Sequence, residues 1–285
     1  MPALFVLLWS TGFIGARLGV RHAEPFTFLL IRFALVVVVL ALVVMATRAP
    51  WPRSWRLAGH LTVAGVLVHA IYLGGVFAAI HRGLPTGLAA LVVGLQPILT
   101  AFVAGPFLGE RVSLRQWCGL VLGLLGVWLV LSSKLAGPDA FGWDALAFVV
   151  AALLGITAGT LYQKRFCTGM DLRSGTLLQY VGATAFMLAP ALLFETGEIH
   201  WTGEFVFALA WLVIVLSLGA VMLLMTLIRL GRATSVSSLF YLTPPTTAVM
   251  AWAVVDERLS AVALAGMVVA AAGVALVVAP LGRRA

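Results

Sequence analysis

Long apolar stretches, each bounded by charged residues, proline or glycine, run along almost the whole chain. Residues 33–44 are apolar at every position, whereas a strand in a membrane barrel alternates apolar and polar residues. The stretches have the length of about 20 residues that an α-helix needs to cross a bilayer. The pattern predicts an all-α integral membrane protein with ten transmembrane helices, near residues 3–20, 26–46, 57–79, 85–105, 114–132, 142–163, 174–194, 205–228, 234–254 and 260–280.

Composition supports a membrane protein and excludes a soluble domain. Of the 285 residues, 62% are hydrophobic and only 10% are charged, against about 25% charged in average chains. The net charge of +8 would suggest nucleic-acid binding in a soluble protein, but here it follows the loops. With a cytoplasmic N-terminus, the inner loops and tail hold 12 of the 18 Lys and Arg residues and the outer loops hold four. This bias predicts cytoplasmic N- and C-termini and leaves no role for nucleic acid.

A repeat with an offset of 147 residues divides the chain into two halves. The sequence GERVS at residues 109–113 recurs as DERLS at residues 256–260, and Pro97 recurs as Pro244. Each half holds five predicted helices, an odd number, so the second half would insert in the opposite orientation. Inverted repeats are typical of secondary transporters, which bind substrate near the midplane between the halves. The predicted five-helix domains are residues 1–135 and residues 140–285.

Several motifs resemble the paired EamA repeats of the drug/metabolite transporter superfamily. They are WSTGF at residues 9–13 followed by Arg17, GLQP at 94–97 leading into GER at 109–111, and YLTP at 241–244 leading into DER at 256–258. The resemblance covers nearly the whole chain, and bacterial exporters of aromatic and other amino acids are the most similar members. It implies ten helices, both termini in the cytoplasm, and export or exchange of small metabolites.

Polar and aromatic residues deep in the predicted helices are candidates for substrate binding. His69 is the only histidine deep in a span, and the spacing of an α-helix places Tyr72 on the same face. An ionisable residue in a membrane faces the protein interior or water, and the alternative reading is a histidine hydrogen-bonded to a neighbouring helix. Tyrosines within spans favour an interior where the hydroxyl finds a partner. The predicted substrate-binding residues, which together would form an aromatic-lined pocket, are Trp9, Phe13, His69, Tyr72, Gln96, Tyr180 and Tyr241.

Prolines predict a break in the fourth helix, at Pro97, and in the ninth, at Pro244 and Pro245. Interrupted helices at corresponding positions of two halves are the best sequence indication of a transporter site. Gln96 and Tyr241 are candidates for this reason. The alternative is that Ser and Thr side chains of the ninth helix only join packed helices.

Four further residues are predicted to have a gating or charge role. Arg32 lies about two turns inside the second helix, where an arginine is costly without a partner or an aqueous path. It either attracts a substrate carboxylate or forms an internal structural pair. Arg17 and the corresponding Lys164 can reach the membrane surface with their long side chains. Gln179 corresponds to Arg32 in the second repeat.

Small residues predict close packing between the fifth and tenth helices. Gly119, Gly123 and Gly126 lie in the fifth helix, and Gly266 and Gly273 lie in the tenth. Small residues let helix backbones approach closely, so these two helices should pack together and hold the halves. The predicted functional unit is therefore a monomer.

The sequence predicts an exporter in the bacterial inner membrane. Its expected substrates are small metabolites, most of all amino acids including aromatic ones, moved by alternating access. A multidrug or organic-cation efflux protein is the first alternative. A non-transporting scaffold or an intramembrane enzyme is the second, but the chain has no nucleophile motif, phosphate-binding loop or cluster of metal ligands. We therefore expect no enzyme activity, no cofactor and no metal, and as partners only a small-molecule substrate and membrane lipid.

Overall fold

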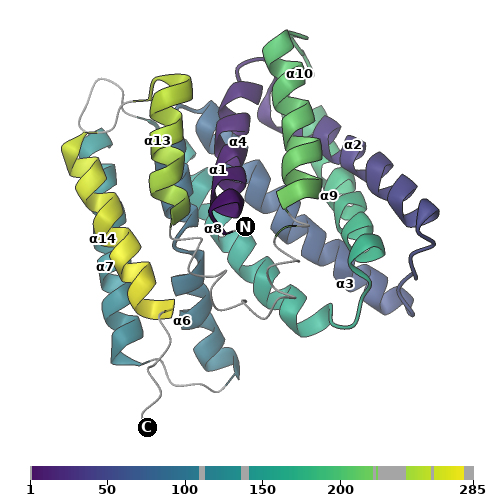
Figure 1. The fold of residues 1–285 in the computed structure, drawn as a ribbon, viewed down its shortest axis with the longest axis horizontal. Helices are drawn as coiled ribbons and strands as arrows, with labels where there is room; N and C mark the ends of the chain where they lie inside the picture. Colours follow the sequence, from purple (N-terminus) through teal and green to yellow (C-terminus); the bar gives the residue numbers. More distant parts are fainter. Residues whose placement is uncertain are drawn as a thin grey trace. The chain divides into compact units, whose positions relative to one another are not determined.

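The computed structural model of this protein describes residues 2–108, 113–135, 141–220, 223, 242–257 and 260–278. Within these ranges the chain is helical and contains no β-strand, which confirms the all-α fold (Figure 1). That the chain crosses the membrane ten times stays a prediction. In the described part, five helical stretches are long and apolar enough to span a bilayer: Pro25–Ala46, Trp55–His81, Trp143–Phe166, Leu172–Phe194 and Gly203–Ala220.

The described helices fall on the predicted spans, three of which are divided into shorter segments. The third span consists of α3 (Trp55–Gly65), the π-helix η1 (Val66–Ile71) and α4 (Tyr72–His81). The fourth span consists of α5 (Thr86–Val93) and α6 (Gln96–Leu108). The eighth span consists of α10 (Gly203–Ala210) and the π-helix η2 (Trp211–Ala220). The other helices are α1 (Pro2–Gly19), α2 (Pro25–Ala46), α7 (Leu114–Leu135), α8 (Trp143–Phe166), α9 (Leu172–Phe194), α13 (Thr243–Val255) and α14 (Ala261–Val278).

The predicted break in the fourth span is confirmed between α5 and α6. Pro97 has no N–H group, and its ring would clash with the carbonyl of Val93 if the helix continued. The backbone N–H of Leu95 instead donates to the carbonyl of Val92 at 3.1 Å, which closes the end of α5. In the ninth span α13 begins at Thr243, and the predicted site residue Tyr241 lies outside the described residues.

Two π-helical segments occupy corresponding positions of the predicted repeats. Adding the offset of 147 to residues 66–71 of η1 gives residues 213–218, which lie within η2. π-Helical turns are rare in proteins and are frequently found at functional sites. His69 lies within η1 and Tyr72 begins α4, so the α-helical spacing that predicted a shared face does not apply between them.

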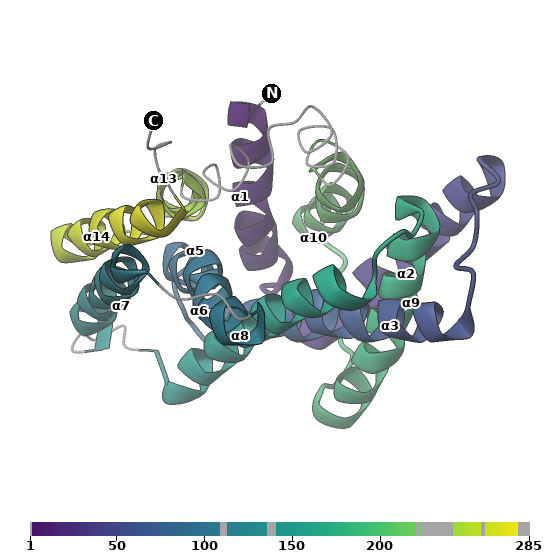
Figure 2. The ribbon, with the colours of Figure 1, turned by 90° about the horizontal axis from the view of Figure 1, so that it is seen from below.

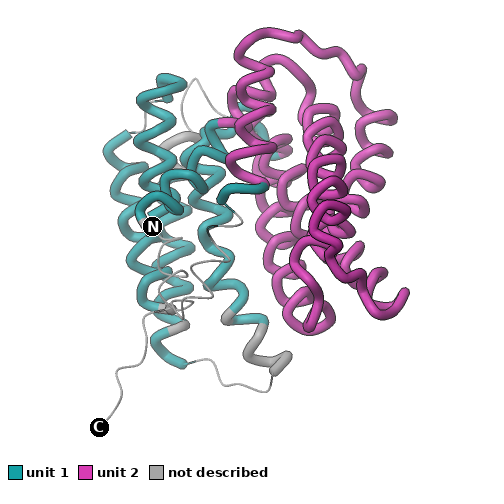
Figure 3. Tube along the Cα trace, turned by 45° about the vertical axis from the view of Figure 1, so that its right-hand side comes forward, with its two compact units in different colours: residues 1–14, 83–143, 218–285 teal, residues 15–82, 144–217 magenta. Residues whose placement is uncertain are grey.

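The chain divides into two compact units (Figure 3). Unit 1 contains residues 1–14, 83–143 and 218–285, and unit 2 contains residues 15–82 and 144–217. Each unit therefore combines segments of both predicted repeats. The boundaries of the repeats themselves stay a prediction.

In unit 2, α2 and α9 pack side by side and run in opposite directions. Adding 147 to Pro25 gives Leu172, so the two helices begin at corresponding positions of the repeats. Glu24, just before α2, accepts a hydrogen bond from the backbone N–H of Thr196, just after α9, at 2.7 Å. Beyond the other end of α2, the carbonyl of Pro50 accepts a hydrogen bond from the Ser174 hydroxyl at 2.6 Å. Corresponding helices of the two repeats are thus antiparallel, as an inverted repeat requires.

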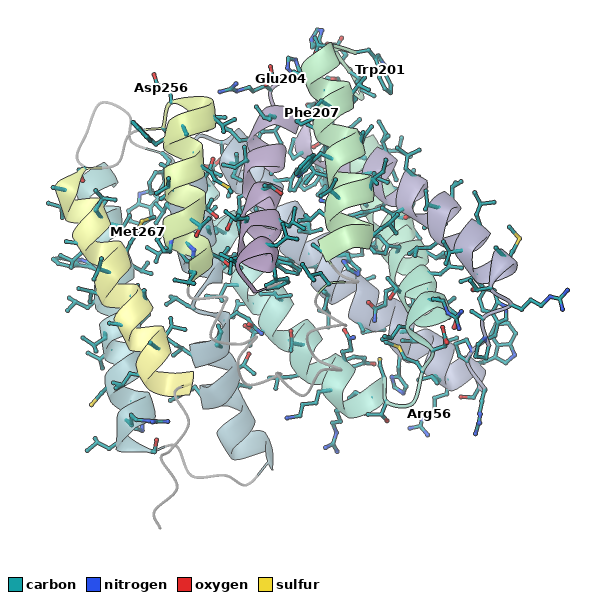
Figure 4. All side chains as sticks on the ribbon, viewed as in Figure 1. Arg56, Trp201, Glu204, Phe207, Asp256 and Met267 are labelled. Atoms are coloured by element: carbon teal, nitrogen blue, oxygen red, sulfur yellow. The ribbon has the colours of Figure 1, made fainter. Side chains whose placement is uncertain are left out.

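Loop contacts within each unit join segments that the sequence places on the same side of the membrane. In unit 2, Arg82, in a predicted outer loop, forms an ion pair at 2.9 Å with Asp144, at the outer end of the predicted sixth span. In unit 1, the Glu257 carboxylate accepts a hydrogen bond from the Thr86 hydroxyl at 2.6 Å, and both residues belong to predicted outer segments. Figure 4 shows Trp201 and Glu204 at one end of unit 2 and Arg56 at the opposite end, as the predicted topology requires.

The predicted orientation can be tested by labelling single cysteines in cells. After Cys118 and Cys167 are replaced, a cysteine at Ser133 or Gly197 should react with a membrane-impermeant reagent from the periplasm. A cysteine at Arg53 or Arg284 should react only after the cytosol is opened, because the positive charge of the loops stays inside. Labelling of position 284 from outside would contradict both the even number of spans and the inverted repeat.

In unit 1, α7 and α14 lie side by side and pack along a line of glycines (Figures 1 and 2). A Cβ atom on Gly126 would lie 2.5 Å from the carbonyl oxygen of Gly266, and one on Gly273 would lie 2.6 Å from that of Gly119. Gly119 corresponds to Gly266 and Gly126 to Gly273, so the repeat relates the two contacts to each other. The predicted packing of small residues between these helices is confirmed.

Candidate functional site

The most deeply buried charge among the described residues is Arg32, on α2, with 2% of its surface exposed. An isolated charge is expensive in an apolar environment, so its contacts show whether the cost is offset. Arg32 donates a hydrogen bond from Nη2 to the Ser217 hydroxyl at 3.2 Å. Its Nε and Nη1 atoms are buried and have no hydrogen-bond partner in the described part of the chain. The guanidinium is therefore only partly satisfied.

Ser217, on η2, joins Arg32 to Tyr180. Its oxygen accepts hydrogen bonds from Arg32 and from the Tyr180 hydroxyl, the latter at 3.3 Å. Its own hydroxyl proton is donated to the carbonyl of Leu212 at 3.0 Å, five residues earlier in the π-helix. A hydroxyl has one proton and two lone pairs, so these three contacts occupy it fully. Ser217 has no capacity left for the remaining donors of Arg32.

An aromatic layer lies beside this hydrogen-bonded group. The rings of His69 and Tyr180 are stacked, with centroids 4.1 Å apart and planes 18° apart. Phe33 meets Tyr180 edge to face at 5.6 Å. Tyr72, at the start of α4, is also buried and lies close to Arg32. The layer gives the site a flat, apolar side next to its charged one.

Two further polar atoms of the site are buried without a partner among the described residues. They are Nε2 of His69 and Nε2 of Gln179. The side chain of Gln179 lies beside His69, and Arg32 is close enough to act on the histidine electrostatically. Buried polar groups in native proteins are nearly always hydrogen-bonded, so several exceptions in one place need an explanation.

The cluster lies where the two repeats meet inside unit 2. Arg32 and Gln179 occupy corresponding positions at the offset of 147, as do Phe33 and Tyr180. A residue can approach its counterpart only near the axis that relates the two copies, and Phe33 and Tyr180 are in contact. The approximate symmetry is broken chemically, because one repeat supplies a cation and the other a neutral amide.

No acidic residue of the described chain pairs with Arg32. The sequence contains no Asp or Glu between Glu24 and Glu110, and none between Glu204 and Asp256. The helix α9 is also without acids. The membrane-spanning part of the cluster therefore carries a positive charge without a matching carboxylate. Among the described residues, no group of three or more His, Cys, Asp or Glu side chains could hold a metal ion.

The structure brings five of the predicted site residues together in unit 2. They are Arg32, His69, Tyr72, Gln179 and Tyr180, which together with Ser217 we call the Arg32 cluster.

Three other predicted binding residues belong to unit 1. Trp9 packs against Phe5 with ring centroids 5.4 Å apart, and Phe13 is buried one turn further along α1. Gln96, at the start of α6, donates a hydrogen bond to the Thr100 hydroxyl at 3.2 Å. The role of these three residues in substrate binding stays a prediction.

The remaining two predicted residues lie near helix ends in unit 2. Arg17 donates a hydrogen bond to the carbonyl of Ile80 at 3.4 Å, and Lys164 is exposed near the end of α8. Both positions fit side chains that extend toward the membrane surface.

Ser217 was not predicted from the sequence. It is the only polar side chain in the run Trp211–Ala220, which is otherwise apolar or glycine. A single hydroxyl in such a run was the available signal, because serine in a transmembrane helix must bond its own backbone or a neighbour.

Comparison with known proteins identifies the family. The model of the EamA-like transporter family matches residues 2–132 and 142–279. The chain belongs to this family. It is therefore a membrane transporter with two EamA repeats.

Two distant relatives match nearly the whole chain. The chain is 26% identical over 281 residues to the Bacillus subtilis (strain 168) protein named "Uncharacterized transporter YvbV", covering 96% of this chain and 89% of that one. It is 26% identical over 289 residues to the "Probable terminal-alkyne amino-acid exporter" of Streptantibioticus cattleyicolor, and the match covers 99% of this chain and 93% of that one. A solved crystal structure aligns with a TM-score of 0.67 and 19% identity, over 100% of this chain and 97% of its own, and supports the fold alone.

Proposed function

We propose that this transporter exports amino acids, aromatic ones included, across the bacterial inner membrane by alternating access. The observation that carries the proposal is the Arg32 cluster, a set of shielded polar and aromatic groups inside apolar helices. Segments of both predicted repeats contribute to it, through α2, η1 and α4 on one side and α9 and η2 on the other. Transporters with inverted repeats bind substrate between their repeats, near the midplane.

The paired π-helices support a site that opens and closes. η1 carries His69 and η2 carries Ser217, so each π-helix contributes a side chain to the cluster. In the state described, the cluster is closed to solvent, with Tyr180 and Gln179 only 3% and 4% exposed. Alternating access would open it to one side of the membrane at a time, by moving helices of one repeat against the other.

The aromatic layer and the charge of the cluster bear on the substrate. Flat side chains such as Tyr180, His69 and Tyr72 offer a surface on which a planar substrate side chain can pack. The positive charge of Arg32 would repel a cation, which argues against an organic-cation or multidrug exporter. One relative bears the name of an amino-acid exporter, and its match covers nearly all of both chains.

A panel of radiolabelled substrates on proteoliposomes tests the proposal. We expect exchange of amino acids, with phenylalanine and tyrosine among the substrates, and no exchange of tetraphenylphosphonium or tetraethylammonium. Vesicles without protein give the background. Transport of the cations without transport of any amino acid would contradict the proposed substrate class.

A matched pair of tyrosine variants ties that transport to the cluster. Tyr72→Ala should lower the transport of aromatic amino acids about fivefold or more, since a lost aromatic contact is worth about 1 kcal/mol or more. Tyr162→Ala should leave transport normal, because Tyr162 pairs with His60 outside the Arg32 cluster, at 2.7 Å. If Tyr72→Ala transports normally per folded molecule, Tyr72 has only a structural role.

A further inference from the structure

We infer that the Arg32 cluster recognises the carboxylate of its substrate and has no subsite for an ammonium group. The ligand class is therefore hydrophobic or aromatic monocarboxylates, with or without an α-amino group. This inference rests on the proposed function and narrows it, because an amino-acid exporter of the usual description would need both charged groups of its substrate.

The first step is the unused hydrogen-bonding capacity of Arg32. Its Nε and Nη1 atoms are buried without a partner in the described part of the chain, while Nη2 is held by Ser217. A guanidinium binds a carboxylate best through two parallel N–H groups, which gives both specificity and strength. The contact with Ser217 orients the side chain and uses one of the two protons of Nη2. The second Nη2 proton lies parallel to a proton of Nε or of Nη1, so one such pair of donors stays available for a carboxylate.

The second step is the position of the other free donor groups. Nε2 of Gln179 is a donor in its amide form, and Nε2 of His69 becomes one in the appropriate tautomer. Both atoms are buried without a partner among the described residues, in the same cluster. Donor atoms without a partner among the described residues therefore lie in the same cluster as a cation, and this arrangement suits an anion.

The third step is the absence of a partner for an ammonium group. The sequence places all ten Asp and Glu residues at or beyond the ends of the predicted helices. The acids that flank α2 and α9 in the described structure, Glu24, Asp171 and Glu195, accept hydrogen bonds from backbone N–H groups at the helix ends. An α-ammonium group at Arg32 would meet a like charge and no counter-ion, so it contributes little to binding.

An internal structural role would look different. A structural arginine in an apolar span is stabilised when its donors are satisfied by carboxylates or carbonyls of neighbouring helices. Arg32 has one hydroxyl partner, and that hydroxyl is shared with Tyr180 and with the backbone. The missing partners are the ones that a substrate carboxylate would supply.

Three related probes test the inference on the purified protein without any mutation. They are L-phenylalanine, 3-phenylpropionate, which lacks the amino group, and 2-phenylethylamine, which lacks the carboxylate. Binding is measured by calorimetry or by ligand-induced thermal stabilisation in detergent. We expect Kd values within about threefold for the two carboxylates, and binding of the amine at least roughly tenfold weaker, as for the loss of one charged hydrogen-bonded contact. An amine that binds as tightly as 3-phenylpropionate overturns the inference.

Variants of Arg32 then assign the carboxylate to this side chain. Arg32→Gln, which installs the residue found at the corresponding position of the second repeat, should weaken 3-phenylpropionate binding at least roughly tenfold. Arg32→Lys keeps the charge without the planar fork and should bind with intermediate affinity. Arg56→Gln removes an exposed charge at one end of unit 2 and serves as the control. A folded Arg32→Gln protein with unchanged affinity overturns the assignment.

Failure of the inference and failure of the proposed function give different results. If proteoliposomes transport phenylalanine and 2-phenylethylamine equally well, the protein is an exporter of amino acids as proposed, but the inferred carboxylate subsite is overturned. Carboxylate-dependent binding together with no transport of any amino acid supports the subsite and contradicts the proposed function.

Discussion

Replacing Gly126 with leucine is expected to leave little correctly folded protein. A Cβ atom at this position would lie 2.5 Å from the backbone nitrogen of Ala270 and the carbonyl oxygen of Gly266. Both are backbone atoms, so no side-chain rotation relieves the clash, and α7 and α14 must move apart. Membrane helices associate largely through close packing, which such a separation removes.

The expected size of the effect follows from overpacking. Forcing extra atoms into a packed interface costs about 1–3 kcal/mol, and more where the backbone has to shift. In a protein of this size each kcal/mol lowers Tm by roughly 2–4 °C, so we expect a decrease on the order of 10 °C or complete loss of the folded peak. Size-exclusion chromatography and thermal unfolding in detergent measure both.

Gly59→Leu is the matched control. Gly59 lies within α3, and no atom lies within 4 Å of the position that its Cβ would take. The change adds the same side chain to a helix without creating a clash. If the Gly126→Leu protein elutes and melts like the Gly59→Leu protein, α7 and α14 do not pack through these glycines.

The outline of the fold could be predicted from the sequence because the bilayer imposes it. A helix must be apolar along its membrane length, so runs such as residues 33–44 mark spans directly. Pro97 predicted the break before α6 because proline cannot continue the hydrogen-bond pattern of a helix. The glycines of α7 and α14 predicted a close contact, since only small residues permit one. Each of these predictions depends on local chemistry.

The arrangement of the site could be predicted only in part, because it depends on which helices meet. The sequence identified Arg32 and Gln179 as corresponding residues, but their place in one cluster requires that α2 and α9 pack against each other in antiparallel orientation. The π-helices were missed because nothing in the sequence at residues 66–71 or 211–220 distinguishes a π-turn from an α-turn. Ser217 was missed for the same reason, since its role comes from contacts with α2 and α9.

A pH gradient alone is not expected to concentrate substrate in proteoliposomes. Proton-driven transporters commonly use an ionisable residue within the membrane that takes up and releases the proton. Arg32 cannot take up and release the proton, because a guanidinium stays protonated in proteins. His69 is the one group of the Arg32 cluster whose unperturbed pKa, about 6.5, lies near neutral pH. We therefore predict facilitated export or exchange down the substrate's own gradient, with at most a modest effect of pH through His69.

Three of the described carboxylates support this expectation, because hydrogen bonds engage them at helix ends. Glu195 accepts hydrogen bonds from two backbone N–H groups at the start of α2, at 2.8 and 2.6 Å. The Glu257 carboxylate accepts hydrogen bonds from the backbone N–H and from the hydroxyl of Thr86, at the start of α5. Hydrogen bonding to Arg173 lowers the pKa of Asp171, at the start of α9, to about 2. A carboxyl with that pKa stays ionised at physiological pH and carries no proton across the membrane.

The experiment compares two driving forces in the same vesicles. Proteoliposomes with equal phenylalanine on both sides receive an imposed pH gradient, and a parallel set receives a phenylalanine gradient without a pH difference. We expect net movement only in the second set, for the unmodified protein and for His69→Ala alike if the variant is folded. Uphill accumulation driven by protons that disappears in His69→Ala would make His69 the coupling residue. Accumulation that survives in His69→Ala would show that a carboxyl at a helix end carries the proton. Glu257 would then be the first residue to replace with glutamine, because it caps α5 and joins it to the end of α13.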